Sequence, residues 1–177
     1  MHVTVLSDRD IKRLLAQREF LVEPLGHGAI GPASVDLRLG ETMIRYEAQT
    51  IDLGTSVPHT EELIIPPEGH VLKPGEFILG TTLEAIRIPN DHEGFIDTKG
   101  DMARAGLQIH SNDAHIDAGT CGRITLEIKN LHARDVRLVL HAGMYICQLF
   151  LVRLSSATTR PYAGKYANQI KPTAYIP

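Results

Sequence analysis

The sequence of 177 residues contains no tryptophan, and aromatic residues make up only 5% of it. Proteins that bind single-stranded nucleic acid usually stack the bases on aromatic side chains, so this composition argues against such a binder. Cysteine is also scarce, and the two cysteines, Cys121 and Cys147, lie far apart in the sequence. The economical interpretation is a reduced cytosolic protein, although the pattern leaves a disulfide between the two open.

A surplus of basic residues is missing as well. The chain has 18 Lys and Arg against 21 Asp and Glu, a net charge of −3. Proteins that bind duplexes neutralise many phosphates, so a DNA or RNA polymer is not an expected partner. A small polyanion is compatible with this balance, because basic side chains can converge locally whatever the net charge. The residues available for this are Lys99, Arg104, Arg160, Lys165 and Lys171.

Long apolar runs are absent too. No stretch approaches the roughly 20 apolar residues of a membrane-spanning helix. The N-terminal segment lacks the basic region and apolar core that mark a signal peptide. With 43% apolar residues and no linker, residues 1–177 are expected to form one domain with its own core. We therefore expect a soluble cytoplasmic protein with no membrane partner.

Alternation of apolar and polar residues is the most frequent pattern in the sequence. In residues 34–39, apolar side chains alternate with Asp36 and Arg38, which is typical of a strand with one face in a core. Further strands, separated by turns that contain Gly, Pro or Asp, are expected at residues 42–46, 62–65, 77–83, 85–88, 123–129, 136–140 and 145–153. Many short strands predict a mainly β protein, built as a sandwich or a barrel.

Helical spacing is confined to two short segments. Ser7 and Asp10 resemble a capping box, and apolar residues then recur at helical spacing, which predicts a helix over residues 8–17. Residues 102–105 are the best candidate for a second short helix. Helices are therefore expected to be a minor part of the fold.

The strand at residues 123–129 carries the most informative carboxylate. Its even-numbered positions are apolar, so Glu127 is expected to point away from the core. A carboxylate on a solvated strand face is common, and the position alone would not single it out. The turn directly before the strand, residues 117–122 with two glycines, sets it apart.

Several catalytic motifs are missing. Zinc-dependent cytosine deaminases need an HxE pair and a CxxC pair, and this chain has His59 and Glu61 but no CxxC, so no zinc is predicted. The GxSxG elbow, the P-loop and the GxGxxG fingerprint are also absent. A metal-free hydrolytic route is still compatible with the sequence, because a carboxylate such as Glu127 can take a proton from an attacking water.

Five segments carry a resemblance to a known family. They are PASVDLRLG (residues 32–40), KGDMARAGL (99–107), DAHIDAGTCGRITLEIKN (113–130), GMYICQLFL (143–151) and RPYAGKYANQ (160–169). In this order and at these distances, the segments resemble the dCTP deaminase family. Its relatives include bifunctional dCTP deaminase/dUTPases and the trimeric dUTPases.

The resemblance implies a fold, an assembly and a ligand. The expected fold is a distorted β-barrel or jelly-roll-like arrangement of the dUTPase type with one or two short helices. The expected assembly is a homotrimer with active sites between subunits, in which residues 160–177 form a C-terminal lid. The ligand would be a deoxycytidine or deoxyuridine nucleotide, with Mg²⁺ held by its phosphates and no direct protein ligand for the metal.

The resemblance also implies roles for individual residues. Glu127 would be the general base, Asp117 would contact the deoxyribose, and the tail would engage the triphosphate. The residues that it assigns to nucleotide binding are Lys99, Gly100, Asp101, Met102, Ala103, Arg104, Asp117, Thr125, Leu126, Gln148, Tyr162, Lys165 and Gln169.

Two of these positions depart from the family pattern. Gly100 and Asp101 stand where the family has serines, the first of which is thought to anchor the attacking water. A carboxylate at position 101 would be repelled by phosphate oxygens in a low dielectric unless a cation intervenes. Either Mg²⁺ bridges the two groups or the ligand is not ordinary dCTP.

The resulting prediction is hydrolytic deamination of a deoxycytidine nucleotide, with dCTP giving dUTP and ammonia. Three alternatives stay open: a bifunctional enzyme that releases dUMP, a dUTPase without deaminase activity, and a relative that binds a nucleotide without turnover. The substitutions at Gly100 and Asp101 favour the last two, whereas the retained Glu127 and the intact tail favour an active enzyme.

Overall fold

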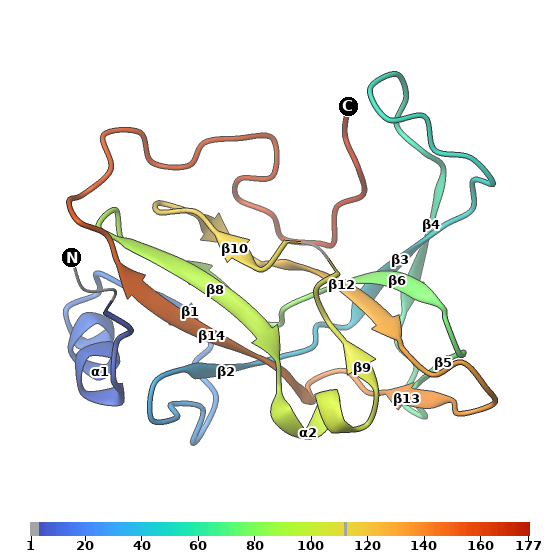
Figure 1. Cartoon of the computed structure of the whole chain (residues 1–177), viewed down its shortest axis with the longest axis horizontal. Helices are drawn as coiled ribbons and strands as arrows, with labels where there is room; N and C mark the ends of the chain where they lie inside the picture. Colours follow the sequence, from blue (N-terminus) through green and yellow to red (C-terminus); the bar gives the residue numbers. More distant parts are fainter. Residues whose placement is uncertain (1–3, 112) are drawn as a thin grey trace.

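The computed structural model describes residues 4–111 and 113–177 (Figure 1). The helices in these ranges are α1 (Asp8–Ala16) and α2 (Gly100–Arg104). The strands are β1 (Leu21–Glu23), β2 (Val35–Arg38), β3 (Thr42–Tyr46), β4 (Thr60–Ile64), β5 (His70–Leu72), β6 (Phe77–Thr81), β7 (Ala85–Arg87), β8 (His92–Thr98), β9 (Leu107–Gln108), β10 (His115–Ile116), β11 (Cys121–Gly122), β12 (Thr125–Asn130), β13 (Leu138–Leu140) and β14 (Tyr145–Arg153). Neither helix is long and apolar enough to cross a membrane.

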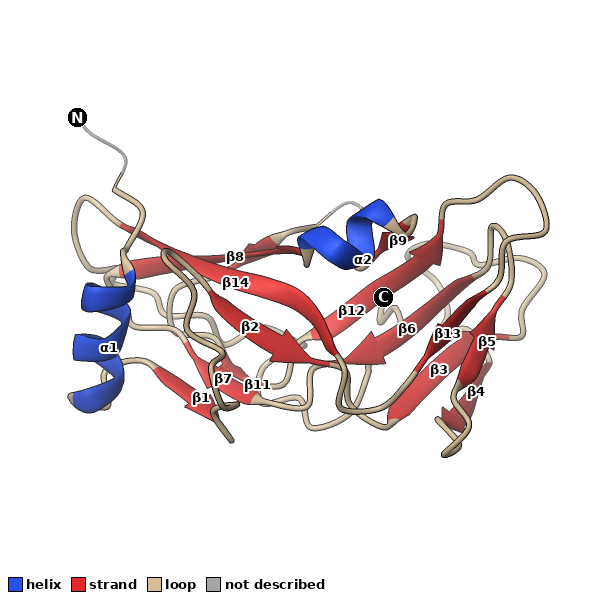
Figure 2. Cartoon of the chain, turned by 90° about the horizontal axis from the view of Figure 1, so that it is seen from below, coloured by secondary structure: helices blue, strands red, loops and turns tan. Residues whose placement is uncertain are grey.

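Two large antiparallel sheets form the body of the molecule (Figure 2). One has the strand order β10-β8-β14-β2 and the other β4-β3-β6-β12-β9. Smaller sheets, β1-β7-β11 and β13-β5, lie beside them. The prediction of a mainly β protein with two short helices is confirmed. None of the sheets in the described ranges closes on itself, so the expected distorted barrel consists of open sheets.

One apolar core joins the elements. Along β14 the buried Ile146, Leu149 and Leu151 alternate for the most part with more exposed neighbours, as the period of a strand requires. Helix α1 adds Ile11 and Leu14 to the same cluster of buried residues. The amphipathic pattern predicted for residues 8–17 thus corresponds to a helix that caps one end of the core.

The two cysteines are free thiols. Cys121 is exposed and Cys147 is fully buried on β14. Burial, together with the nearby carboxylates of Glu84 and Asp36, raises the pKa of the Cys147 thiol well above its usual value. The disulfide that the sequence left open is absent, and Cys147 behaves as a small apolar core residue.

A buried ion pair between Arg38 and Glu84 joins β2 to the turn that follows β6. The carboxylate of Glu84, which is 0% exposed, accepts hydrogen bonds from Arg38 Nε at 2.6 Å and from the Arg38 backbone N–H at 2.8 Å. Arg38 also donates to the carbonyl of Pro24 at 2.9 Å. A buried carboxylate is tolerated only with such partners, so these bonds fix β2 against the turn that follows β6.

Strand β8 was not predicted from the sequence. Its inward positions include Gly94, which interrupts the apolar pattern on which the prediction relied. A Cβ at Gly94 would lie 3.1 Å from the Ile88 side chain and 3.2 Å from those of Ile116 and Leu149. The glycine is therefore needed for close packing between β8 and its neighbours, and the two-residue strand β10 pairs with β8 at this point.

Candidate active site

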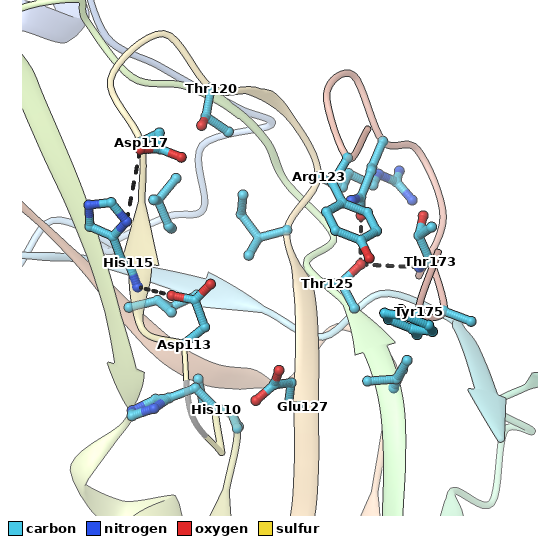
Figure 3. Close-up of a pocket in the computed structure, with 18 of the residues that line it drawn as sticks. His110, Asp113, His115, Asp117, Thr120, Arg123, Thr125, Glu127, Thr173 and Tyr175 are labelled. Carbon is cyan, nitrogen blue, oxygen red and sulfur yellow. Dashed lines mark hydrogen bonds and ion pairs between the residues drawn. The ribbon is translucent and has the colours of Figure 1, made fainter. Parts of the chain in front are cut away.

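A cavity of about 440 Å³ lies between β12, β10 and the C-terminal tail (Figure 3). We call it the Glu127 cavity. Glu127 points into it from β12, between a wall that carries His115 and Asp117 and a wall that carries Thr125 and Tyr175. The polar residues thus come from segments far apart in the sequence, and the apolar strand residues behind them belong to the core.

Glu127 is held in a defined position. Its neighbours Leu126 and Ile128 are 1% and 0% exposed, so the strand period turns the half-buried Glu127 side chain toward the cavity. The backbone N–H of Glu127 donates to the carbonyl of Ile109 at 2.8 Å, and the backbone N–H of Ser111 donates to Glu127 Oε2 at 2.7 Å. The segment at residues 109–111 therefore orients the carboxylate.

The opposite wall combines acids and histidines. The backbone N–H of His115 donates to Asp113 Oδ1 at 3.1 Å. The ring of His115 lies between two carboxylates, with Nε2 beside Glu93 and Nδ1 at 3.9 Å from Asp117 Oδ1. Sequence reasoning identified Asp117 and missed the other three, along with His110 at the base of the cavity. Its only signal for His110, Asp113 and His115 was the polar run at residues 110–115, whereas Glu93 lies on β8, a strand that the sequence did not predict.

Glu93, His115 and Asp117 also form the one group in the described ranges whose His, Cys, Asp or Glu ligand atoms lie close enough to hold a metal, all within 4.8 Å of one another. The two ring nitrogens of His115 face different carboxylates, so the ring lies between Glu93 and Asp117. This set differs from the His and Cys ligands of zinc deaminases.

The C-terminal tail runs along the upper edge of the molecule in Figure 1 and contributes Tyr162, Gln169 and Tyr175 to the lining of the cavity. Tyr162 N–H donates to the carbonyl of Ala118 at 2.9 Å, and Arg123 N–H donates to the carbonyl of Gln169 at 2.7 Å. Thr125 Oγ1 donates to Gln169 Oε1 at 2.6 Å and accepts the N–H of Thr173 at 3.1 Å. Thr125 is therefore one of the residues that hold the middle of the tail.

The glycines of the turn before β12 allow the C-terminal tail to lie directly against this turn. A Cβ at Gly119 would lie 2.6 Å from Pro161 Cβ, and one at Gly122 would lie 2.7 Å from the backbone nitrogen of Gln169. Both glycines have positive φ, 87° and 122°. The turn that singled out Glu127 in the sequence thus serves as the surface on which the tail rests.

The end of the tail is anchored on the β3–β4 hairpin. Lys171 Nζ lies 2.9 Å from Glu62 Oε1, and the N–H of Tyr175 donates to the Tyr46 hydroxyl at 3.0 Å. The Tyr46 ring stacks on Phe77 with centroids 6.5 Å apart, and all three aromatic residues line the cavity. Residues 160–177 therefore run past the Glu127 cavity to the hairpin.

The structure brings together five of the residues assigned by the resemblance. These cavity-lining residues are Asp117, Thr125, Glu127, Tyr162 and Gln169. Leu126 contributes no side chain to the lining, because that side chain lies in the core. The Lys165 amine donates to the carbonyl of Ile176 and lies 5.6 Å from the centroids of two tyrosine rings of the tail.

The remaining assigned residues lie outside the cavity of the same chain. Lys99 pairs with Asp36, and Gln148 Nε2 donates to Asp36 Oδ1 at 3.0 Å. On α2, Arg104 lies 3.8 Å from Asp101, and the two side chains are 85% and 75% exposed. Figure 1 places α2, and with it Gly100, Met102 and Ala103, at the edge of the molecule opposite the tail.

Comparison with known proteins identifies the family of the chain. The model of the dCTP deaminase-like family matches residues 5–154. The chain belongs to this family. Similar curated proteins are the dUMP-forming dCTP deaminases of Dictyoglomus thermophilum and Mycolicibacterium smegmatis, both 38% identical over 96% of the chain and over 93% and 94% of their own lengths. The predicted resemblance to dCTP deaminase-like enzymes is confirmed.

A solved structure supports the same fold. The crystal structure of 2'-deoxycytidine 5'-triphosphate deaminase from Agrobacterium tumefaciens matches with a TM-score of 0.65 and 25% identity over 86% of this chain. This chain spans about half of that longer one, 49%. The expected dUTPase-type fold is in agreement with this match.

Proposed function

We propose that the chain hydrolyses the exocyclic amino group of a deoxycytidine nucleotide, with Glu127 as the general base. The observation that carries the proposal is a carboxylate in a cavity, oriented by the Ser111 N–H at 2.7 Å and covered by the tail. Family membership and the names of the relatives support the substrate class.

Glu127 would act through a water molecule. The carboxylate takes one proton as the water oxygen bonds to C4 of the cytosine ring. The protons then pass to the ring and to the amino group, the C4–N bond breaks, and ammonia leaves. Cytosine and one water thus give uracil and ammonia with no change in oxidation state.

The favoured final product is dUMP. The relatives are named dUMP-forming, whereas the main prediction from the sequence was dUTP. We therefore adopt the bifunctional alternative, in which a second water cleaves the triphosphate and pyrophosphate is released. Mg²⁺ would be held by the phosphate oxygens and would neutralise part of their charge.

The nucleotide would lie between protomers of a homotrimer. The charged residues that line the cavity of one chain are Asp113, Asp117, Glu127, Arg123 and the titratable His110 and His115. A triphosphate needs more positive charge than this set provides. Lys99 and Arg104 of a neighbouring protomer would supply it, since neither residue lines the cavity of its own chain. The cytoplasmic location stays a prediction.

An assay of the purified chain with Mg²⁺ tests the proposal. We expect dCTP to yield ammonia, pyrophosphate and dUMP. Release of ammonia without pyrophosphate would leave a deaminase that stops at dUTP. Pyrophosphate from dUTP with no ammonia from any deoxycytidine nucleotide would instead establish a dUTPase, and the absence of every product would contradict an enzymatic role.

A further inference from the structure

Arg123 is the only lysine or arginine among the described residues that line the Glu127 cavity. The family resemblance gives it no role. Arg123, Thr125 and Glu127 occupy every second position and all three line the cavity, as side chains on one face of an extended segment do. Because a guanidinium is always protonated near neutral pH, this part of the cavity carries a fixed positive charge.

The guanidinium of Arg123 has few partners within the chain. Its Nη1 donates to the carbonyl of Ile170 at 3.4 Å, which is a long and exposed hydrogen bond. Arg38, by contrast, lies 2.6 Å from the buried Glu84 carboxylate. Within residues 4–111 and 113–177, Arg123 forms no such ion pair. Most of its five N–H donors are therefore available to a ligand.

Gln169 brings further donors to the same place. The backbone N–H of Arg123 donates to the Gln169 carbonyl at 2.7 Å, so the two residues are neighbours. The side-chain oxygen of Gln169 accepts the hydroxyl of Thr125 at 2.6 Å. Its side-chain NH₂ group donates to none of the described residues and is not among their buried polar atoms, so a ligand can reach it. An acceptor with several oxygens suits this pair of donor groups.

The position of Arg123 along the chain suits the phosphate end of a nucleotide. Figure 3 shows Thr125 between Glu127 and Arg123. Four residues of extended chain span about 13 Å, so a base held at Glu127 would lie well away from Arg123. The resemblance assigns Thr125 to the nucleoside, which would fill the space between the two. The group that reaches Arg123 would then be the phosphate chain beyond the sugar.

We infer that Arg123 binds the terminal phosphates of a nucleotide whose base lies at Glu127 of the same chain. This inference rests on the proposed function. The planar fork of the guanidinium donates two parallel N–H groups to two phosphate oxygens, and the Gln169 NH₂ group donates to a third. The contact competes only with the long bond to Ile170. Arg123 is therefore a binding residue that distinguishes a triphosphate from a monophosphate.

The test is calorimetric titration of the full chain with dCTP and with dCMP in an E127Q background, where turnover is blocked. R123Q should weaken dCTP binding about 10- to 100-fold, as for a lost hydrogen bond between charged groups, and dCMP binding by less than about threefold. R123K keeps the charge without the fork and should lie between the two. The control is R134Q, which changes an exposed arginine and should leave both affinities unchanged.

Two results would overturn the inference. One is a dCTP affinity of R123Q within threefold of its parent. The other is an equal loss of affinity for dCTP and dCMP, since Arg123 would then act on the whole site. Faster amide hydrogen exchange of residues 169–175 in R123Q without nucleotide would identify that effect as a loosened tail. The titration needs no turnover, so its failure leaves the proposed deamination untouched, whereas absence of ammonia release by wild type would refute the proposed function itself.

Discussion

At the scale of single residues, the alternation of side chains along β12 decides which of them reach the Glu127 cavity. Glu127 was assigned to the outward face because Leu126 and Ile128 are apolar, and the structure has this arrangement. The same alternation places the Leu126 side chain in the core, so only the backbone of Leu126 is available to a nucleoside. A residue's role that is implied by family resemblance therefore needs to be checked against the alternation of buried and exposed side chains along its strand.

His110, Asp113 and His115 could not be predicted as cavity residues. Each is a single polar residue in a run without clear periodicity, and such residues are usually solvated. Their position follows from the pairing of the two-residue strand β10 with β8, His115 opposite Phe95. That pairing depends on Gly94 and Leu149, which are distant in the sequence, so the residues around position 115 contain no pattern that predicts it.

Asp101 gives a prediction at this scale. If α2 contacts the phosphates of a nucleotide bound to a neighbouring protomer, D101S should strengthen dCTP binding about fivefold, because two charges 4 Å apart in water interact by about 1 kcal/mol. The change also frees Arg104 from its contact at 3.8 Å. The measurement is calorimetric titration of dCTP in an E127Q background, where turnover is blocked.

The exposed Asp135 offers a matched control, since D135S removes the same charge elsewhere on the surface. A smaller gain is expected for dCMP, which carries fewer phosphate charges. Weaker dCTP binding by D101S would mean that the carboxylate has a favourable role, such as holding a cation.

At the scale of elements, two strands were predicted with their observed bounds, whereas the seven-residue β8 was missed. Strands β3 and β14 have the bounds expected from the sequence, and α1 ends one residue earlier than expected. The missed strands include β9, β10 and β11, which are two residues long. Strands this short have no period of their own and are formed by their partners.

The tail was predicted as a lid from resemblance alone, and the structure supplies its contacts. Thr125 connects β12 to the tail through its bonds to Gln169 and Thr173. Lys165, by contrast, contacts other residues of the tail and not the cavity. Tail residues therefore divide into those that contact β12 and those that contact only the tail itself.

A substitution of Thr125 tests this contact. T125V keeps the shape of the side chain and removes both hydrogen bonds, each worth about 1 kcal/mol. We expect amide hydrogen exchange of residues 169–175 to become roughly 5- to 30-fold faster without nucleotide. T125S, which retains the hydroxyl, serves as the control, and unchanged exchange in T125V would show that the tail is held by other contacts.

At the scale of the whole molecule, the site divides into two parts. Glu127 and the tail lie together, whereas α2, which carries Arg104, lies at the opposite edge of the chain in Figure 1. The sequence gives the order of these segments and not their distance, so only the three-dimensional structure reveals this separation. A trimer would reunite them, with a mass in solution three times the 19.5 kDa of the chain.

The most direct test of the account is ammonia release from dCTP by E127Q, measured beside wild type and beside E68Q, which changes an exposed glutamate. Loss of the general base should lower kcat by at least about 100-fold, while the affinity for dCTP stays within a few fold and E68Q behaves as wild type. An E127Q protein that releases ammonia at a near-normal rate would contradict the assignment of Glu127 as the base.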